Sequence, residues 1–89
     1  MSECQLKKKE IVRKHLAPLI RACKNDGWGA DYMLGDEIIE RFNPRHETIY
    51  PRSEYVVATA ENGYHYYIDV SADSPLTMIY EAVKLLQYK

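Results

Sequence analysis

The side chains that could perform covalent or metal chemistry are few and lie far apart in the sequence of 89 residues. A cysteine nucleophile needs a base beside it, and neither Cys4 nor Cys23 lies in a motif that supplies one. Zinc ligands usually lie a few residues apart in the sequence. None of the three histidines, His15, His46 and His65, lies that close to a cysteine or to another histidine, so the sequence predicts no zinc site. We therefore expect a protein that is not an enzyme and that holds no metal or cofactor.

Paired carboxylates and glycine-rich loops, which serve acid–base and phosphate chemistry, offer no better candidate. Asp36 and Glu37 are adjacent, so they point in different directions on a helix, and their negative charge there suits helix capping. The stretch Gly27-Trp28-Gly29 lacks the residues that follow in either nucleotide-binding fingerprint. The residue type that most suggests a function in this sequence is tyrosine, as a contact residue for a binding partner.

Tyrosine supplies eight of the ten aromatic residues. Its ring combines a large contact area with a hydrogen-bonding tip, and the residue is favoured at protein interfaces. Alternation along a strand places Tyr67 opposite its neighbours Tyr66 and Ile68, on a sheet face that two helices on the other side would leave open. This face predicts a contact surface for a protein partner or for a second copy of the chain, formed by Tyr67, Val56, Ala58, His65 and Asp69.

Positive charge is concentrated near the N-terminus, although the whole chain has a net charge of −1. Residues 1–24 contain seven lysines and arginines against two carboxylates, a balance of +5, and residues 25–89 contain five against eleven, a balance of −6. These basic residues can form a solvated helix face. A basic helix can also lie along phosphates, so the alternative function is nucleic-acid binding through Lys7, Lys8, Lys9, Arg13 and Lys14.

Helical periodicity places apolar residues on one stripe between about residue 5 and residue 24. Pro18 lacks an amide hydrogen and its ring collides with the carbonyl of Lys14, so we expect a kink or a break near Ala17. Lysines and arginines fill the side opposite the stripe, which consists of Val12, Leu16, Leu19, Ile20 and Cys23.

A β-hairpin is the clearest local pattern. Two β-prone runs, residues 54–60 and 64–70, flank Asn62-Gly63, the residue pair typical of a type I′ turn. A two-residue turn closed by Glu61 and Tyr64 pairs Val57 with Ile68. The predicted inward face is then apolar or aromatic throughout, and it consists of Tyr55, Val57, Tyr64, Tyr66, Ile68 and Val70.

Shorter elements flank the hairpin. Asp36 is placed to cap a helix over residues 37–42, which turns Ile38, Ile39 and Phe42 inward. Residues 46–50 are expected to be extended, although Pro51 confines them to a strand end or a sheet edge. Ser74 and Pro75 begin a last helix, whose predicted inward side contains Leu76, Ile79, Tyr80, Val83, Leu86 and Gln87.

Together these elements predict an α+β fold in two layers, with residues 1–89 as one compact domain. The expected order is a helix, a short helix, a small antiparallel sheet of two or three strands, with residues 46–50 as the candidate third strand, and a closing helix, with the helices packed on one sheet face. No apolar run approaches the roughly 18–20 residues of a membrane span, and no apolar core follows the lysines as a signal peptide would require. We expect a cytosolic protein that occupies a partner's surface, similar in size and composition to compact acidic proteins of phages and mobile elements.

Overall fold

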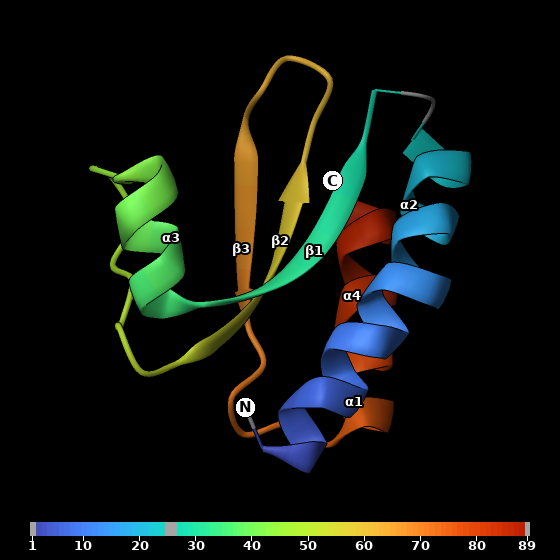
Figure 1. The fold of residues 1–89 in the computed structure, drawn as a ribbon. Coiled ribbons are helices and arrows are strands. Elements are labelled where there is room, and N and C mark those ends of the chain that lie inside the picture. Colours follow the sequence, from blue (N-terminus) through green and yellow to red (C-terminus); the bar gives the residue numbers. More distant parts are fainter. Residues whose placement is uncertain (1, 25–26, 89) are drawn as a thin grey trace.

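The fold is α+β, as predicted, and its three strands form one antiparallel sheet. The computed structural model describes residues 2–24 and 27–88 (Figure 1). In chain order the elements are α1 (Glu3–Ile11), the π-helical turn η1 (Val12–Leu16), α2 (Ala17–Lys24), β1 (Gly29–Leu34), α3 (Gly35–Phe42), β2 (Glu54–Thr59), β3 (His65–Asp69) and α4 (Pro75–Tyr88).

The sheet lies between two helical layers, so helices cover both of its faces (Figure 1). The column of α1, η1 and α2, together with α4, packs on what we call the first face. α3 packs on the second face, where it buries Ile38 against Met33, Tyr55 and Val57. The prediction that all helices share one face is wrong, because α3 follows directly from β1 and crosses to the opposite side.

α1, η1 and α2 form one continuous helical column (Figure 1), and the π-helical turn ends two residues before Pro18. The N–H of Ala17 donates to the carbonyl oxygen of Val12, five residues back, instead of four. This wider turn lies where the proline ring would collide with the Lys14 carbonyl of a regular α-helix. The irregularity predicted near Ala17 is therefore present as a π-helical turn.

The wider turn changes which residues of the column face the sheet. Val12, Leu16 and Ile20 are buried, as predicted. Leu19 and Cys23 are exposed instead of inward, because the wider π-helical turn changes the helical phase after it, so that of the predicted residues beyond the turn only Ile20 continues the buried row.

The hairpin between β2 and β3 forms, but its loop is one residue longer than predicted. The N–H of Ala60 donates to the carbonyl oxygen of Tyr64 (2.8 Å), and the N–H of Gly63 donates to the carbonyl oxygen of Ala60 (2.9 Å). Gly63 adopts a φ of +85°, which favours glycine. This is the type I turn followed by a glycine bulge, so the loop closes on Ala60 and Tyr64, not on Glu61 and Tyr64.

The additional loop residue shifts the strand pairing by one position and exchanges the faces of β2. Val56 pairs with Ile68, and Val57 pairs with Tyr67, so the predicted pair of Val57 and Ile68 is wrong. Val56 consequently packs under the helical column on the first face, and Val57 lies with Tyr67 on the second face.

The third strand is β1 and not residues 46–50, which do not belong to the sheet. β1 pairs with β2 along its whole length, from Gly29 to Leu34. Glycine and aspartate are depleted in strands, so the local composition of β1, which includes Gly29 and Asp31, does not indicate a strand.

α3 begins two residues earlier than predicted, at Gly35. Its first amides find backbone partners: the N–H of Gly35 donates to Ser53 (2.8 Å) and that of Asp36 donates to Pro51 (2.9 Å). Asp36 therefore lies inside the first turn and does not cap the helix. Ile39, predicted to face inward, is exposed.

α4 begins as predicted, and Ser74 caps it, since the N–H of Thr77 donates to the Ser74 hydroxyl (3.2 Å). Within the ranges given above, no helix has both the length and the apolar character needed to cross a membrane.

The buried side of α4 differs from the predicted one. Met78 is completely buried, whereas Leu76 and Tyr80 are exposed. The predicted inward side chains of Leu86 and Gln87 lie outside the side chains that the structure describes.

Candidate protein-contact site

The five residues predicted to form one contact surface do not lie on the same face of the sheet. Val56 and Ala58 are completely buried on the first face, because the shifted register turns them toward the helical column. Tyr67, His65 and Asp69 lie on the second face. The predicted strip that joins Tyr67 to Val56 and Ala58 therefore does not exist, and any contact surface must be built from other neighbours.

A hollow of about 230 Å³ opens beside Tyr67 on the second face. α3 and the segment that follows it cover the rest of this face, so the prediction of an open face is only partly correct. The lining comes from the end of α3, from residues 44–47 and from the chain between Gly63 and Tyr67. We call this site the Tyr67 hollow; its aromatic and charged lining residues are Phe42, Arg45, His46, Glu47, Tyr64, His65 and Tyr67.

Aromatic rings in tilted contact form the wall of the Tyr67 hollow. The ring centroids of Phe42 and His65 are 4.1 Å apart at an angle of 31°, and those of His65 and Tyr67 are 6.3 Å apart. The hydroxyl oxygen of Thr59 lies 3.0 Å from Nδ1 of His65, which holds the imidazole ring in place. Rings that are held from behind in this way offer apolar contact area with little loss of side-chain freedom on binding.

Burial and the charges at the rim of the hollow both change the pKa of Tyr67. Burial raises the pKa of Tyr67 above the ordinary value of 10, and the negative charge of Glu47 and the neighbouring Tyr64 raise it further. The Tyr67 hydroxyl is therefore neutral at physiological pH and can donate or accept a hydrogen bond. Glu47 is exposed, so the rim presents a carboxylate close to the rings.

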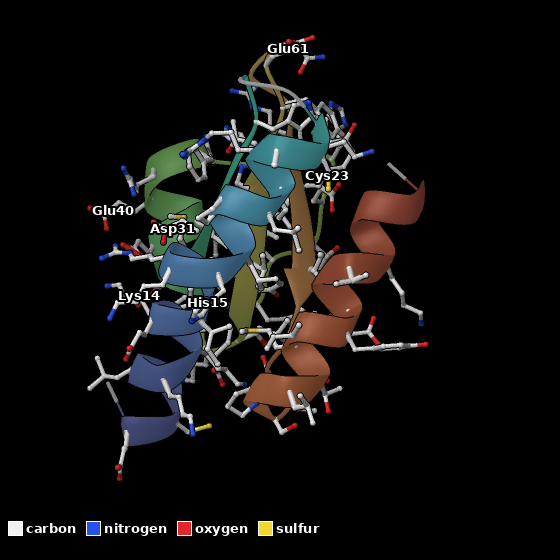
Figure 2. All side chains as sticks on the ribbon, turned by 90° about the vertical axis from the view of Figure 1, so that its right-hand side faces the viewer. Lys14, His15, Cys23, Asp31, Glu40 and Glu61 are labelled. Carbon is white, nitrogen blue, oxygen red and sulfur yellow. The ribbon has the colours of Figure 1, made fainter. Side chains whose placement is uncertain are left out.

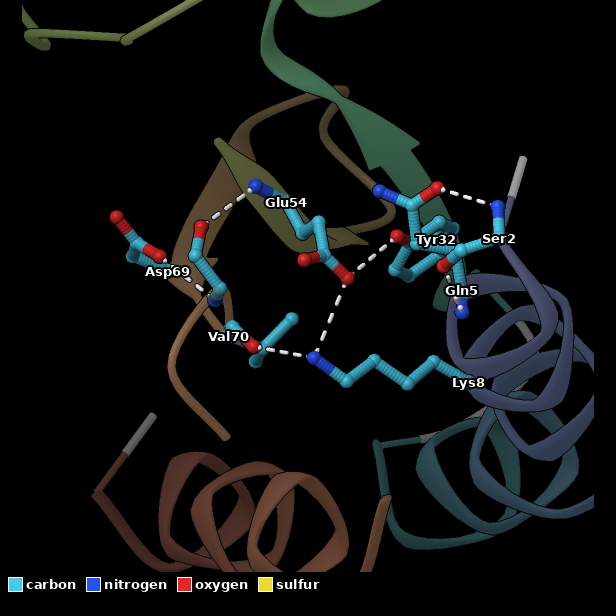
Figure 3. A network of polar contacts seen from close by, with 8 residues as sticks. Ser2, Gln5, Lys8, Tyr32, Glu54, Asp69 and Val70 are labelled. Carbon is cyan, nitrogen blue, oxygen red and sulfur yellow. Dashed lines mark hydrogen bonds and ion pairs between the residues drawn. The ribbon is translucent and has the colours of Figure 1, made fainter. Parts of the chain in front are cut away.

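A separate polar cluster beneath α1 removes Lys8 from the predicted basic surface. Figure 3 shows the Lys8 ammonium group between two acceptors, 3.2 Å from Glu54 Oε1 and 2.7 Å from the carbonyl oxygen of Val70. The hydroxyl of Tyr32 donates to the same oxygen of Glu54 (2.7 Å). Lys8 is only 1% exposed, so it cannot contact a nucleic acid in this structure.

In an alkaline titration followed by tyrosinate absorbance, Tyr32 is expected to ionise well above the ordinary value of 10. Burial, the hydrogen bond to Glu54 and the charge of Glu54 raise the pKa of Tyr32. Because its folded pKa exceeds its unfolded pKa, the stability that Tyr32 contributes is complete below about pH 10 and is lost at higher pH. Tyr32→Phe should remove the last ionisation step; an unchanged titration curve in this variant would contradict the assignment.

Arg13 and Lys14 are exposed residues of the π-helical turn η1, and Figure 2 shows Lys14 on the surface of the helical column. Arg13 Nε is 3.3 Å from Asp31 Oδ1, and Lys14 Nζ is 3.1 Å from Glu10 Oε1. These carboxylates offset part of the positive charge that a nucleic acid would meet. The five candidates thus comprise one buried lysine, two ion-paired residues and the two remaining lysines, exposed Lys7 and half-buried Lys9.

Sequence reasoning missed the contribution of Phe42, Arg45, Glu47 and Tyr64 to this site. The predicted register turns Tyr64 inward, whereas the longer loop leaves it 52% exposed with its ring centroid 4.7 Å from that of Tyr66. The helical pattern assigns Phe42 to the core. Residues 43–47 have neither helical nor strand periodicity, so nothing in their sequence indicates that they lie beside β3.

Known proteins do not identify this site. No family model matches the chain, and no curated protein or solved structure is significantly similar to it. Among residues 2–24 and 27–88, no three histidine, cysteine, aspartate or glutamate side chains gather as metal ligands would. The function is therefore inferred from the arrangement of the residues themselves.

Proposed function

We propose that this chain is a small, non-catalytic, cytosolic protein-binding module, and that its Tyr67 hollow receives a side chain of a protein partner. The observation that carries the proposal is the hollow itself. A concave site with an aromatic wall and a charged rim is typical of protein contact sites. Tyrosine is among the residue types that contribute most to binding energy at such sites, and the hollow contains Tyr64 and Tyr67.

The lining of the Tyr67 hollow contains Arg45 as well as Glu47, but the exposed charge on the wider side of the molecule that carries α3 is acidic and favours a partner with a basic surface. Complementary potentials accelerate association and select between partners. A basic surface that normally binds nucleic acid would suit this site, and by occupying it the chain would act as an accessory or inhibitor protein of the phage or mobile-element type. Three exposed arginines, Arg41, Arg45 and Arg52, stand against five exposed carboxylates on the side of the molecule that carries α3: Asp36, Glu37, Glu40, Glu47 and Asp69.

Tyr64→Ala is expected to weaken binding to the partner by about 2 kcal/mol, the typical cost of truncating an aromatic anchor. Tyr80→Ala is the matched control, because Tyr80 is similarly exposed (61% against 52%) but lies on α4, away from the hollow. The partner would be recovered by affinity capture from the native cell, with and without nuclease, and its affinity for each purified variant measured by calorimetry.

A protein that survives nuclease treatment, binds Tyr80→Ala normally and loses affinity for Tyr64→Ala is the expected result. Equal losses in the two variants would contradict the location of the site. Recovery of nucleic acid alone would contradict the protein-binding function and support the alternative.

Nucleic-acid binding through the helical column is expected to be weak and strongly dependent on salt. Lys8 is buried, and Arg13 and Lys14 are paired with carboxylates, so few charges are available to release counterions from phosphates. Titration of labelled duplex DNA and RNA at low and physiological salt measures this binding. A dissociation constant below about 1 µM at physiological salt, abolished by Lys7→Glu, would refute the expectation.

A further inference from the structure

The sheet has two edges, and the hydrogen-bond pattern shows which backbone groups point outward from each. The bonds between Ala60 and Tyr64, and from Val70 to Glu54, mark hydrogen-bonded pairs at the two ends of the β2–β3 ladder. Such pairs alternate with non-bonded ones in an antiparallel ladder. The backbone groups of β3 that point away from β2 are therefore those of His65, Tyr67 and Asp69.

The outer edge of β1 is protected against another strand. The same alternation directs the backbone of Tyr32 outward, and its N–H donates to the carboxylate of Asp31 (2.9 Å). Arg13 lies against this carboxylate (3.3 Å), which ties the helical column to the β1 edge. A side chain that occupies this outward amide removes one of the donors that an added strand would need.

The outer edge of β3 has no such protection. Between His65 and Asp69 there is no proline, lysine or bulge, three of the features that blunt an edge strand, although the strand has only five residues and ends in the charged Asp69. Every residue of β3 is at least partly exposed. Among the described residues, no side chain or backbone group accepts a hydrogen bond from the outward amide of Tyr67.

The sequence of β3 is complementary to itself when it is read in the opposite direction. In an antiparallel pair centred on Tyr67, His65 lies opposite Asp69 of the second copy, Tyr66 lies opposite Ile68, and Tyr67 lies opposite its own equivalent. Acid–base, aromatic–aliphatic and aromatic–aromatic neighbours all stabilise cross-strand pairs. The outward backbone groups fall in the hydrogen-bonded positions of this arrangement, so each finds a partner.

We propose that β3 pairs antiparallel with β3 of a second copy, centred on Tyr67, so that the two three-stranded sheets join into one. This pairing goes beyond the proposed function, and it does not depend on the Tyr67 hollow binding another protein. The contact is short, so the dimer is expected to dissociate in the micromolar range. Asp69→Lys places a lysine opposite His65 twice in the dimer and should raise the dissociation constant about tenfold.

Sedimentation equilibrium of the intact chain tests the pairing, with Glu40→Lys, the same charge change on exposed α3, as the control. The expected result is a concentration-dependent dimer that Asp69→Lys weakens and Glu40→Lys does not. A wild-type chain that stays monomeric up to about 1 mM would overturn the proposal, and so would equal weakening by both variants.

Disulfide trapping tests the register separately. The test uses a chain in which both natural cysteines are replaced by Cys4→Ser and Cys23→Ser. Tyr67→Cys then places one cysteine of each copy opposite the other, with their Cα atoms about 5.5 Å apart, a distance that suits a disulfide. Ala30→Cys, on the protected β1 edge, is the control. Covalent dimer from Tyr67→Cys and not from Ala30→Cys is expected, whereas a dimer linked equally well through both positions would overturn the proposed interface.

Discussion

Lys8→Ala is expected to lower the free energy of unfolding by about 3–5 kcal/mol, because it leaves a carboxylate without its buried counter-charge. Lys8 is 1% exposed, and its ammonium group bonds both Glu54 and the carbonyl of Val70. Removal of the lysine leaves the charge of Glu54 in a site that is screened from water, where it still accepts the hydroxyl of Tyr32. For a small domain this loss is a large part of the total stability.

Lys7→Ala is the matched control, since the neighbouring lysine is exposed and should cost less than about 0.5 kcal/mol. Urea unfolding of the two variants measures the difference. The double variant Lys8→Met, Glu54→Gln removes both charges and should recover part of the loss, because an amide oxygen can still accept from Tyr32. Equal stability of Lys8→Ala and Lys7→Ala would show that the buried pair does not hold α1 against the sheet.

Gly35→Ala is expected to lower the free energy of unfolding by about 2 kcal/mol or more, although alanine is normally the better helix former. A Cβ atom at this position would lie 1.8 Å from the carbonyl oxygen of Tyr50, and backbone cannot move aside as a flexible side chain can. The same segment accepts the first amides of α3 through Pro51 and Ser53. Displacing it would therefore also expose the start of the helix.

Gly29→Ala provides the control for Gly35→Ala, because a Cβ at Gly29 meets nothing within 4 Å. Alanine at Gly29 should leave stability unchanged or raise it by up to about 1 kcal/mol, since the unfolded chain loses freedom. Thermal and urea unfolding separate the two variants. A Gly35→Ala protein as stable as Gly29→Ala would contradict the close approach between α3 and the segment before β2.

The hairpin shows how far local patterns predict this fold. Its two strands and its turn residues are recognisable in the sequence, but Asn62-Gly63 suits both a two-residue turn and a three-residue loop with a glycine bulge. Composition cannot choose between them, because β2 is apolar on both faces, with Val56 and Val57 both buried. The choice depends on α3 covering the second face, which is a tertiary effect.

The position of Lys8 in the sequence indicates that it is buried, although a count of the basic residues does not distinguish it from its neighbours. Positions 8, 12, 16 and 20 form one helical row, and the last three are apolar and buried. A lysine that continues such a row points at the core and needs a partner there, whereas its neighbours Lys7 and Lys9 lie to either side. That partner, Glu54, is 46 residues away in the chain, so the sequence alone does not name it.

The Tyr67 hollow is harder to predict, because it joins segments that are separate in the sequence. Phe42 ends α3, Glu47 lies in an irregular stretch, and Tyr64 closes the hairpin loop. None of these residues is unusual in its local context. Alternation does place Tyr67 opposite Tyr66, but its neighbours follow from the register and from the path of residues 43–47.

Photo-cross-linking from within the hollow tests the central claim most directly. Benzoylphenylalanine would replace Tyr64 in one variant and Tyr80 in another, and each would be irradiated in the native cell. We expect one protein product from position 64 that resists nuclease, differs in mass from a dimer of the chain and is absent from position 80. The same product in equal yield from both positions, or only nucleic acid from position 64, would contradict the Tyr67 hollow as the partner site.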